Sequence, residues 1–152
     1  MALPSIFTQP VAEGIIERIN ALTPNTPPQW GKMSVAQMLA HCNVPYEMTY
    51  ENSHPEPNAL VKLILKMVVK NNVVNEKPYP KNTSTAPQFL IKTEKDFDTE
   101  KKRLIGYIRQ TQALGAQSFD QKKSHSFGVM SATEWNNMFY KHLDHHLTQF
   151  GV

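Results

Sequence analysis

The chain has 152 residues, a length that suits one domain, residues 1–152, with a hydrophobic core of its own. Its composition, 40% hydrophobic and 19% charged, excludes an intrinsically disordered or collagen-like protein. The net charge of +3 comes from lysines that are spread along the chain without interleaved aromatic residues, so we expect no nucleic-acid partner.

The sequence also lacks the features of a secreted or membrane protein. A single cysteine, Cys42, excludes an internal disulfide and favours a reducing compartment, so we expect a cytoplasmic protein. Two prolines interrupt the N-terminal segment, which has no basic region followed by a long apolar core, and we expect no signal peptide there. The longest apolar stretch, residues 59–69, carries two lysines and is too short to span a bilayer, so we expect no membrane partner.

The N-terminal part of the chain is predicted to form a short helix and a loop. Isoleucines recur at helical spacing between about Val11 and Leu22, and Pro24 ends that pattern. Residues 23–33 contain three prolines and a glycine, which are typical of an irregular loop. We expect Trp30 to anchor this loop in the core.

A second helix is predicted from Ser34 to about Tyr50. Ser34 and Gln37 have the spacing of a capping box, in which each side chain binds a free backbone N–H at the start of a helix. Pro45 lies inside this helix and removes the hydrogen bond to the carbonyl of His41. We therefore expect a kink beside this histidine.

The middle of the chain is predicted to contain two further helices joined by a long loop. Residues 59–70 form an amphipathic pattern with lysines opposite an apolar stripe. Residues 71–92, rich in proline and small polar residues, form a loop that must cross the bundle. Thr93 and Asp96 mark the start of the next helix, which ends at Gly115, a residue suited to the left-handed conformation after a helix.

A polar connection over residues 116–130 leads to the last helix. Ser131 and Glu134 form another capping box, so this helix is expected from Ala132 nearly to the C-terminus. No convincing strand pattern is present in the chain. The sequence therefore predicts an all-α protein, a four-helix bundle with an extra short N-terminal helix and a long crossover loop.

The last helix carries the sharpest functional signal, the histidines His142, His145 and His146. On a helix, His142 and His146 lie one turn apart on one face, so both imidazoles can reach a shared point. His145, three residues after His142, is an alternative partner. The same face carries Phe139, so these histidines are expected among core residues, where a divalent cation would satisfy nitrogens that otherwise need hydrogen-bond partners.

His41 is the candidate third ligand. It lies in the helix predicted over residues 34–50 beside apolar residues, and a lone histidine in such a place is more often a hydrogen-bonded core residue than a ligand. Three histidines and one open position, however, make the kind of site that catalytic zinc and related ions prefer. The helix that supplies one ligand must then face the helix that supplies two.

Two motifs near opposite ends of the chain resemble the DinB/YfiT-like family of helical-bundle metalloproteins. One is the WGKMSVAQMLAHC segment, which holds His41, and the other is His142-x-x-x-His146-x-x-Gln149. The resemblance is strongest to a bacterial subfamily of unknown function that is marked by a KMS-x-x-QM-x-x-HC element and a terminal KH-x-x-HH-x-x-QF element. It covers nearly the whole chain.

The resemblance implies both a fold and a ligand set. The fold is an up-down-down-up DinB-like four-helix bundle, and the ligands of one divalent ion are His41, His142 and His146, because the family pattern selects His146 rather than His145. Zinc or nickel is the expected ion, although imidazole also suits copper and iron. Family members with assigned activities are thiol-dependent transferases or isomerases, and a homodimer is suggested by the same similarity.

Other polar side chains are candidates for supporting roles. Gln37 and Gln149 share faces with the candidate ligands and are expected to hydrogen-bond them from outside. His125, before the last helix, lies either at the mouth of the site as a proton shuttle or in a surface loop. His54 is expected to be exposed, and Cys42 to be a small buried residue rather than a ligand.

The sequence supports two classes of function. Three neutral imidazoles would leave the charge of the ion to activate water or a thiol, which predicts a metal-dependent hydrolase or thiol-dependent transferase of a small molecule of unknown identity. The alternative is a non-catalytic bundle in which the ion or the buried histidines are structural. In that case Met67, Phe97 and Tyr107 are candidates to line an apolar groove for a ligand.

Overall fold

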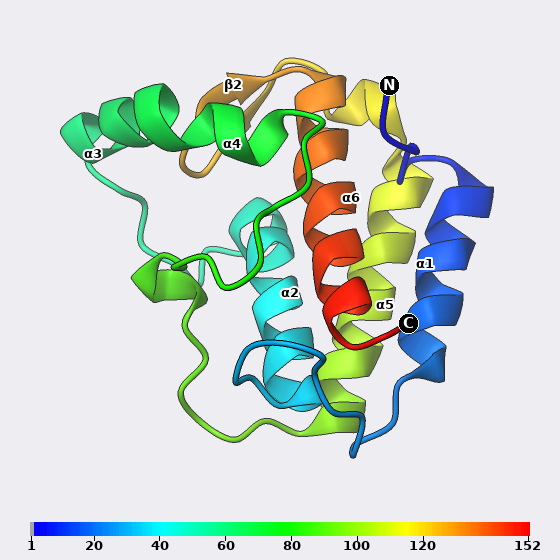
Figure 1. Ribbon diagram of the computed structural model, residues 1–152. Coiled ribbons are helices and arrows are strands. Elements are labelled where there is room, and N and C mark those ends of the chain that lie inside the picture. Colours follow the sequence, from blue (N-terminus) through cyan, green and yellow to red (C-terminus); the bar gives the residue numbers. More distant parts are fainter. Residues whose placement is uncertain (1) are drawn as a thin grey trace.

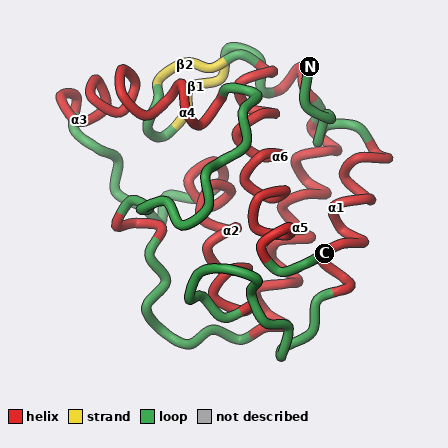
Figure 2. Tube along the Cα trace, in the orientation of Figure 1, coloured by secondary structure: helices red, strands yellow, loops and turns green. Residues whose placement is uncertain are grey.

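Four helices lie side by side in the computed structural model, which describes residues 2–152 (Figure 1). They are α1 (Gln9–Ala21), α2 (Val35–Tyr50), α5 (Phe97–Leu114) and α6 (Ala132–Gln149). In Figure 1, α1 and α6 run in one direction and α2 and α5 run in the opposite direction. Figure 2 shows that helices make up most of the described chain, so the prediction of a mainly helical protein is confirmed.

A further helical segment extends sideways from the end of α6 where that helix begins, across the direction of the four helices (Figure 1). It consists of α3 (Ala59–Ile64), a π-helical turn (Leu65–Val69) and α4 (Lys70–Val74), and we name the whole segment the crossing helix. Its last part, α4, packs against α6. The segment is longer than the predicted helix over residues 59–70, and it runs across the direction of the four helices instead of parallel to them.

The connection between α5 and α6 contains a small β-hairpin that the sequence pattern did not predict. Strands β1 (Lys122–Ser124) and β2 (Gly128–Met130) pair antiparallel. Two short 3-10 turns, Pro87–Phe89 and Ala116–Ser118, lie in the connections before and after α5. Strands of three residues are too short to show an alternating pattern, which explains why the prediction of no strand was wrong.

Both predicted capping boxes form. The Ser34 hydroxyl accepts from the Gln37 N–H at 3.2 Å, and the Gln37 side chain accepts from the Ser34 N–H at 3.0 Å. Ser131 and Glu134 make the same reciprocal pair at the start of α6. These local bonds set where α2 and α6 begin, and therefore which side chains of the two helices face each other.

Helix α5 begins later than its predicted start and ends as predicted. Asp96 caps it by accepting from the Thr99 N–H at 2.8 Å, so Thr93 lies outside the helix. Gly115 follows the last turn with φ +72°, a backbone conformation that favours glycine.

The hydrophobic core lies between α1, α2, α5 and α6. The isoleucines of α1 belong to it, so the N-terminal helix is part of the packing instead of an addition to it. By contrast, no residue of the crossing helix is buried. The largest fully buried side chains include Trp135, Tyr46, Phe119, Phe139, Ile16, Ile19, Met38, Leu39, Leu104 and Ile108.

Helix α2 continues through Pro45 and ends at Tyr50, as predicted. The Thr49 hydroxyl donates to the Pro45 carbonyl at 2.7 Å inside this stretch. Cys42 is buried, also as predicted, and burial raises the pKa of its thiol far above the usual range. No helix among residues 2–152 is both long and apolar enough to cross a bilayer.

Candidate metal centre

Three histidines from two helices meet in the interior between α2 and α6. The side-chain nitrogens that His41, His142 and His146 offer all lie within 4.8 Å of one another. His41 and His142, 101 positions apart in the chain, bring their Nε2 atoms to 2.9 Å. Within residues 2–152 this is the single group of at least three His, Cys, Asp or Glu side chains spaced for one ion.

The ring packing follows from helix geometry. His142 and His146 are one turn apart on α6, and their ring centroids are 4.8 Å apart. His41 on α2 faces both of them, with centroid distances of 4.8 and 4.5 Å. The two helices predicted to face each other therefore do so at the level of these three side chains.

The outer nitrogen of His41 is held by the backbone of a distant loop. Its Nδ1 donates to the Phe89 carbonyl at 2.9 Å. Because a carbonyl can only accept, this bond places the proton on Nδ1 and leaves the Nε2 lone pair facing the other histidines.

The outer nitrogen of His146 is held in the same way by Gln149. Its Nδ1 donates to Gln149 Oε1 at 2.8 Å, and Gln149 Nε2 donates to the Trp30 carbonyl at 2.8 Å. The second bond fixes which way round the carboxamide lies, since only its amino group can donate to a carbonyl. Gly31 makes this approach possible, because a Cβ at that position would lie 2.6 Å from Gln149 Nε2.

Burial keeps the three imidazoles neutral. His41 and His146 are buried, whereas His142 is partly exposed. Burial lowers the pKa of His41, against the raising effect of its bond to Phe89, and it lowers the pKa of His146 to about 3. The pKa of His142 is also well below its usual range. Although the residue as a whole is partly exposed, its ring lies among the other histidines and away from water, and protonated neighbours would repel a proton on it. At neutral pH each ring therefore presents an unprotonated nitrogen.

The donor set fits a divalent transition-metal ion. Nitrogens at 2.0–2.1 Å from a tetrahedral zinc ion are about 3.3 Å apart. The His41 and His142 Nε2 atoms are 2.9 Å apart, and all three nitrogens lie within 4.8 Å of one another, so small side-chain shifts would bring them to this spacing. Neutral imidazoles are the ligands that zinc, nickel and copper share. In metal sites, the outer nitrogen of a ligating histidine commonly donates to a carbonyl or carboxylate, and Phe89 and Gln149 supply such acceptors for His41 and His146.

His145, the alternative partner, points elsewhere. Its ring lies 5.8 Å from the ring of Trp30 and 5.7 Å from that of Tyr79, and it lines a pocket of about 200 Å³ beside α6. Trp30 is half-buried: its ring packs beside His145, and the Lys81 ammonium lies 4.2 Å from its ring centroid. The prediction that Trp30 anchors its loop in the core is therefore wrong. The geometry favours His146 over His145 as the partner of His142.

Gln37 does not reach the histidines. Its oxygen is used by the capping box with Ser34, and its amino group donates to the Thr93 carbonyl at 3.3 Å. The group that hydrogen-bonds His41 is the backbone of Phe89, which sequence reasoning missed. Every residue has a backbone carbonyl, so the residue types could not predict which one bonds His41. The long connection before α5 was the sequence feature that pointed to this loop.

His125 lies away from the three histidines, in the turn between β1 and β2. Its Nδ1 bonds to the Ser126 hydroxyl at 2.8 Å, and its Nε2 donates to the His54 carbonyl at 3.4 Å. The hairpin precedes α6, whose first residue is about 15 Å along the helix axis from His142. A place at the mouth of the site is therefore not supported. His54, expected to be exposed, is partly buried and pairs with Glu47 at 2.6 Å.

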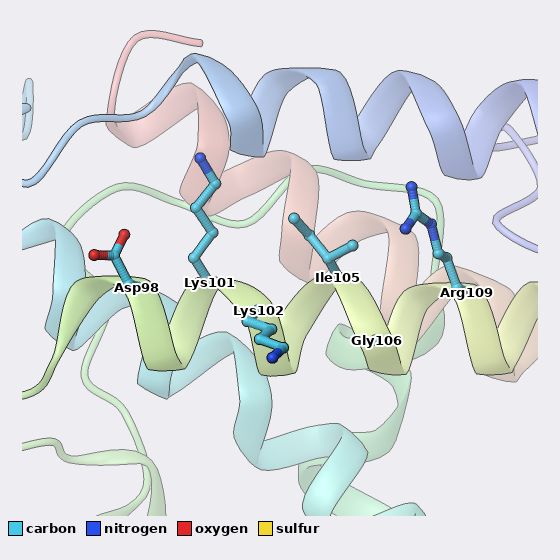
Figure 3. Close-up of a pocket in the computed structure, with 6 residues that line it drawn as sticks. All are labelled: Asp98, Lys101, Lys102, Ile105, Gly106 and Arg109. Carbon is cyan, nitrogen blue, oxygen red and sulfur yellow. The ribbon is translucent and has the colours of Figure 1, made fainter.

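The remaining surface features lie apart from this cluster. A groove of about 420 Å³ lies along α5, and Figure 3 shows that Lys101, Ile105 and Arg109 on it point toward α1. Neither this groove nor the pocket beside His145 is lined by Met67, Phe97 or Tyr107, so these three residues do not form the expected apolar groove there. The groove is lined by Asp98, Lys101, Lys102, Ile105, Gly106 and Arg109.

Comparison with known proteins adds one match. A family model described as a protein of unknown function, DUF1569, matches residues 4–151. Neither the curated proteins nor the solved structures gave a match. The matched range includes all three histidines and every helix of the fold.

Proposed function

Because the chain belongs to the DUF1569 family, whose function is unknown, we propose a function from the site itself: the protein binds one divalent metal ion through His41, His142 and His146. The observation that carries this proposal is the pair of outer hydrogen bonds, from His41 to Phe89 and from His146 to Gln149. These bonds leave the Nε2 lone pairs of His41 and His146 free and direct them toward the point that His142 also faces. Outer hydrogen bonds of this kind commonly orient the histidines of metal sites.

We further propose that the site is catalytic and DinB-like. A divalent ion held by three neutral imidazoles keeps its full positive charge and supplies Lewis-acid chemistry, suited to hydrolysis or to transfer involving a thiol. Among residues 2–152 no fourth His, Cys, Asp or Glu side chain joins the group, which supports an open position over a closed structural site. The opposed directions of α1 and α6 against α2 and α5 support the up-down-down-up arrangement.

Metal content tests the binding proposal. We expect purified or zinc- or nickel-reconstituted protein to hold one ion per chain by elemental analysis, and H142A and H41A to lose it. The matched control is H145A, which removes a neighbouring imidazole outside the group and should keep the ion. Equal metal content in wild type and H142A, or loss of the ion only in H145A, would overturn the assignment.

Turnover tests the catalytic part. Metal-loaded protein is assayed against a panel of esters, amides and electrophiles with thiol acceptors, with H142A as the control for background rate. Turnover that disappears in H142A supports the proposal. If the ion is bound and no substrate turns over or binds, the site is structural and the catalytic part fails.

A further inference from the structure

The crossing helix turns an apolar face to solvent. Five of its large apolar side chains recur at the spacing of one helix face, and we name this set the apolar stripe. Together they expose about 500 Å² of apolar surface, at the upper end of the largest patch on a typical monomer, and patches of this size commonly mark interaction sites. The stripe consists of Leu60 (67% exposed), Leu63 (53%), Ile64 (51%), Met67 (74%) and Val68 (67%).

Lysines follow one edge of the apolar stripe. Lys62, Lys66 and Lys70 are spaced four residues apart, so they form one row along the helix. Lys66 and Lys70 also stand at helical spacing after Leu63, which places the row beside the edge of the stripe that Leu63 forms. Lys66 is exposed and makes no ion pair within residues 2–152.

The crossing helix has no acidic residue of its own. Residues 57–75 contain three lysines and neither aspartate nor glutamate. Lys62 pairs with Glu56 in the exposed loop before the helix, and surface pairs of this kind contribute little to stability. The hydrogen bond from Lys62 lowers the pKa of the Glu56 carboxyl, and the charge of Lys123 on β1 acts in the same direction. The stripe is therefore bordered by positive charge that its own segment does not neutralise.

Bonds on the inner side of the crossing helix fix the stripe outward. Lys70 Nζ lies 2.7 Å from a Glu134 carboxylate oxygen on α6. The Lys141 ammonium donates to the carbonyls of Asn72 and Asn75, each at 2.8 Å. In Figure 1 the α3 end of the segment reaches away from the four helices, whereas α4 lies beside α6. The apolar stripe is thus held in an accessible position by one end of its helix.

The charge pattern disfavours pairing of this face with a second copy of itself. A two-fold interface brings the same patch together from both chains. In an antiparallel pair of crossing helices, the two rows of lysines would lie on the same side, and residues 57–75 supply no carboxylate between them. Like charges placed together in an interface oppose association.

An anionic membrane surface complements both the stripe and its basic edge. An interfacial helix buries its apolar face at the level of the lipid headgroups. Lysines at the edge of that face keep their stems on apolar surface and extend their ammonium groups to the phosphates. Anionic lipids attract such basic segments. Binding at the surface needs no spanning segment, so the expectation of no membrane partner, which was drawn from the length of the apolar stretch, does not exclude it.

We propose that the crossing helix docks this protein on an anionic lipid membrane. The apolar stripe enters the headgroup region, and Lys66 contacts lipid phosphates at its edge. Docking does not depend on the metal ion, since the crossing helix contributes none of the three histidines of the candidate centre.

Co-sedimentation of the full chain with lipid vesicles tests this. We expect binding to phosphatidylcholine vesicles that contain one third phosphatidylserine, and much weaker binding to phosphatidylcholine alone. Added salt should weaken the binding, because it screens the lysines. M67Q removes an apolar side chain without changing the charge and should lower the partition coefficient about 10-fold. K66Q should lower it about 5-fold, the effect of one lysine near an anionic surface.

Two variants on α5 are the matched controls. L114Q replaces an exposed leucine (46%) and K102Q an exposed lysine, and both should bind vesicles as the wild type does. Circular dichroism checks that each variant is folded. A wild type that does not bind anionic vesicles, or equal binding by M67Q and L114Q, would overturn the proposal. So would a dimer of the lipid-free chain that M67Q dissociates, because a second copy would then cover the stripe.

A fluorescent probe tests the geometry independently. Cys42, the native cysteine, is buried, so M67C can be labelled selectively with an environment-sensitive dye. Its emission should rise and shift to shorter wavelength when anionic vesicles are added, because the dye leaves water. The same dye at L114C should keep its spectrum. An equal response at the two positions would show that the stripe is not the docking face.

Discussion

Gln149 connects His146 to the loop that precedes α2. Its two hydrogen bonds, to His146 and to Trp30, determine which nitrogen of His146 carries the proton. The Gln149 side chain is itself buried beside His146. The proposed site therefore depends on a side chain outside the group of three histidines.

Substitution of Gln149 should weaken metal binding without removing a ligand. In Q149L the His146 Nδ1–H loses its acceptor, and we expect zinc affinity to fall about 10–100-fold, the usual effect of losing such a partner. Competition with a chelator of known affinity measures it. Q117L, on an exposed turn, is the control, and equal affinities in the two variants would contradict this role for Gln149.

Replacement of Gly31 by alanine should destabilise the protein and weaken metal binding. Its φ of +82° alone makes G31A cost about 1–2 kcal/mol, and the new Cβ would push Gln149 Nε2 away from the Trp30 carbonyl. Chemical denaturation should show this loss, together with weaker metal binding. G14A is the matched control, because a Cβ there meets no atom within 4 Å and its helix favours alanine.

The buried histidines should make the metal-free protein sensitive to acid. Their pKa values lie below the unfolded value of about 6.5, so the unfolded chain takes up protons first as pH falls. The contribution of these histidines to the free energy of unfolding is therefore fully present above pH 6.5, and it should be lost progressively as the pH falls toward 3. Urea unfolding at a series of pH values measures this. In H146Q the pH dependence should be shallower, and an unchanged slope would contradict the assignment.

At the scale of elements, the sequence predicted where two helices begin, but it did not predict what surrounds each helix in the fold. The starts of α2 and α6 were predicted because a capping box depends only on two residue types three positions apart. The crossing helix was predicted as amphipathic, but the pattern did not show that its apolar side is exposed in the fold. A pattern of apolar residues shows that one face is different, and it does not show which surface covers that face.

Lys141 should matter mainly for the crossing helix. Burial lowers the pKa of its ammonium to about 8, and its three donor bonds end on Asn72 and Asn75. K141M should destabilise the protein by about 1–3 kcal/mol, because the hydrogen bonds from a charged ammonium to the Asn72 and Asn75 carbonyls are lost. Hydrogen exchange should accelerate in α4 and stay slow in α2. The control is K102M on exposed α5 surface, and equal effects would contradict the prediction.

At the scale of the molecule, the candidate centre gathers four stretches of chain. α2 and α6 provide the histidines, and the loops that contain Trp30 and Phe89 provide carbonyls. The spacing of His142 and His146 was visible in the sequence, whereas the pairing with His41 was expected from the resemblance. The two carbonyls were not predictable, because contacts between distant segments depend on the assembled fold.

Because so many segments meet there, ion binding should stabilise the whole fold. At a free ion concentration 100 times Kd, we expect a gain of about 2.7 kcal/mol, which corresponds to a melting temperature about 5–10 °C higher. Thermal melts with zinc and with a chelator measure the difference. H142A should melt at one temperature in both conditions, and an equal shift in that variant would place the ion elsewhere.

The bond from His41 to the Phe89 carbonyl has an evolutionary consequence. Any amino acid at position 89 supplies the same oxygen, so point mutations there can accumulate while the bond is kept. An insertion or deletion in the preceding loop would shift the oxygen out of reach. In related chains, we therefore expect the length of this loop to be conserved, whereas the residue type at position 89 can vary.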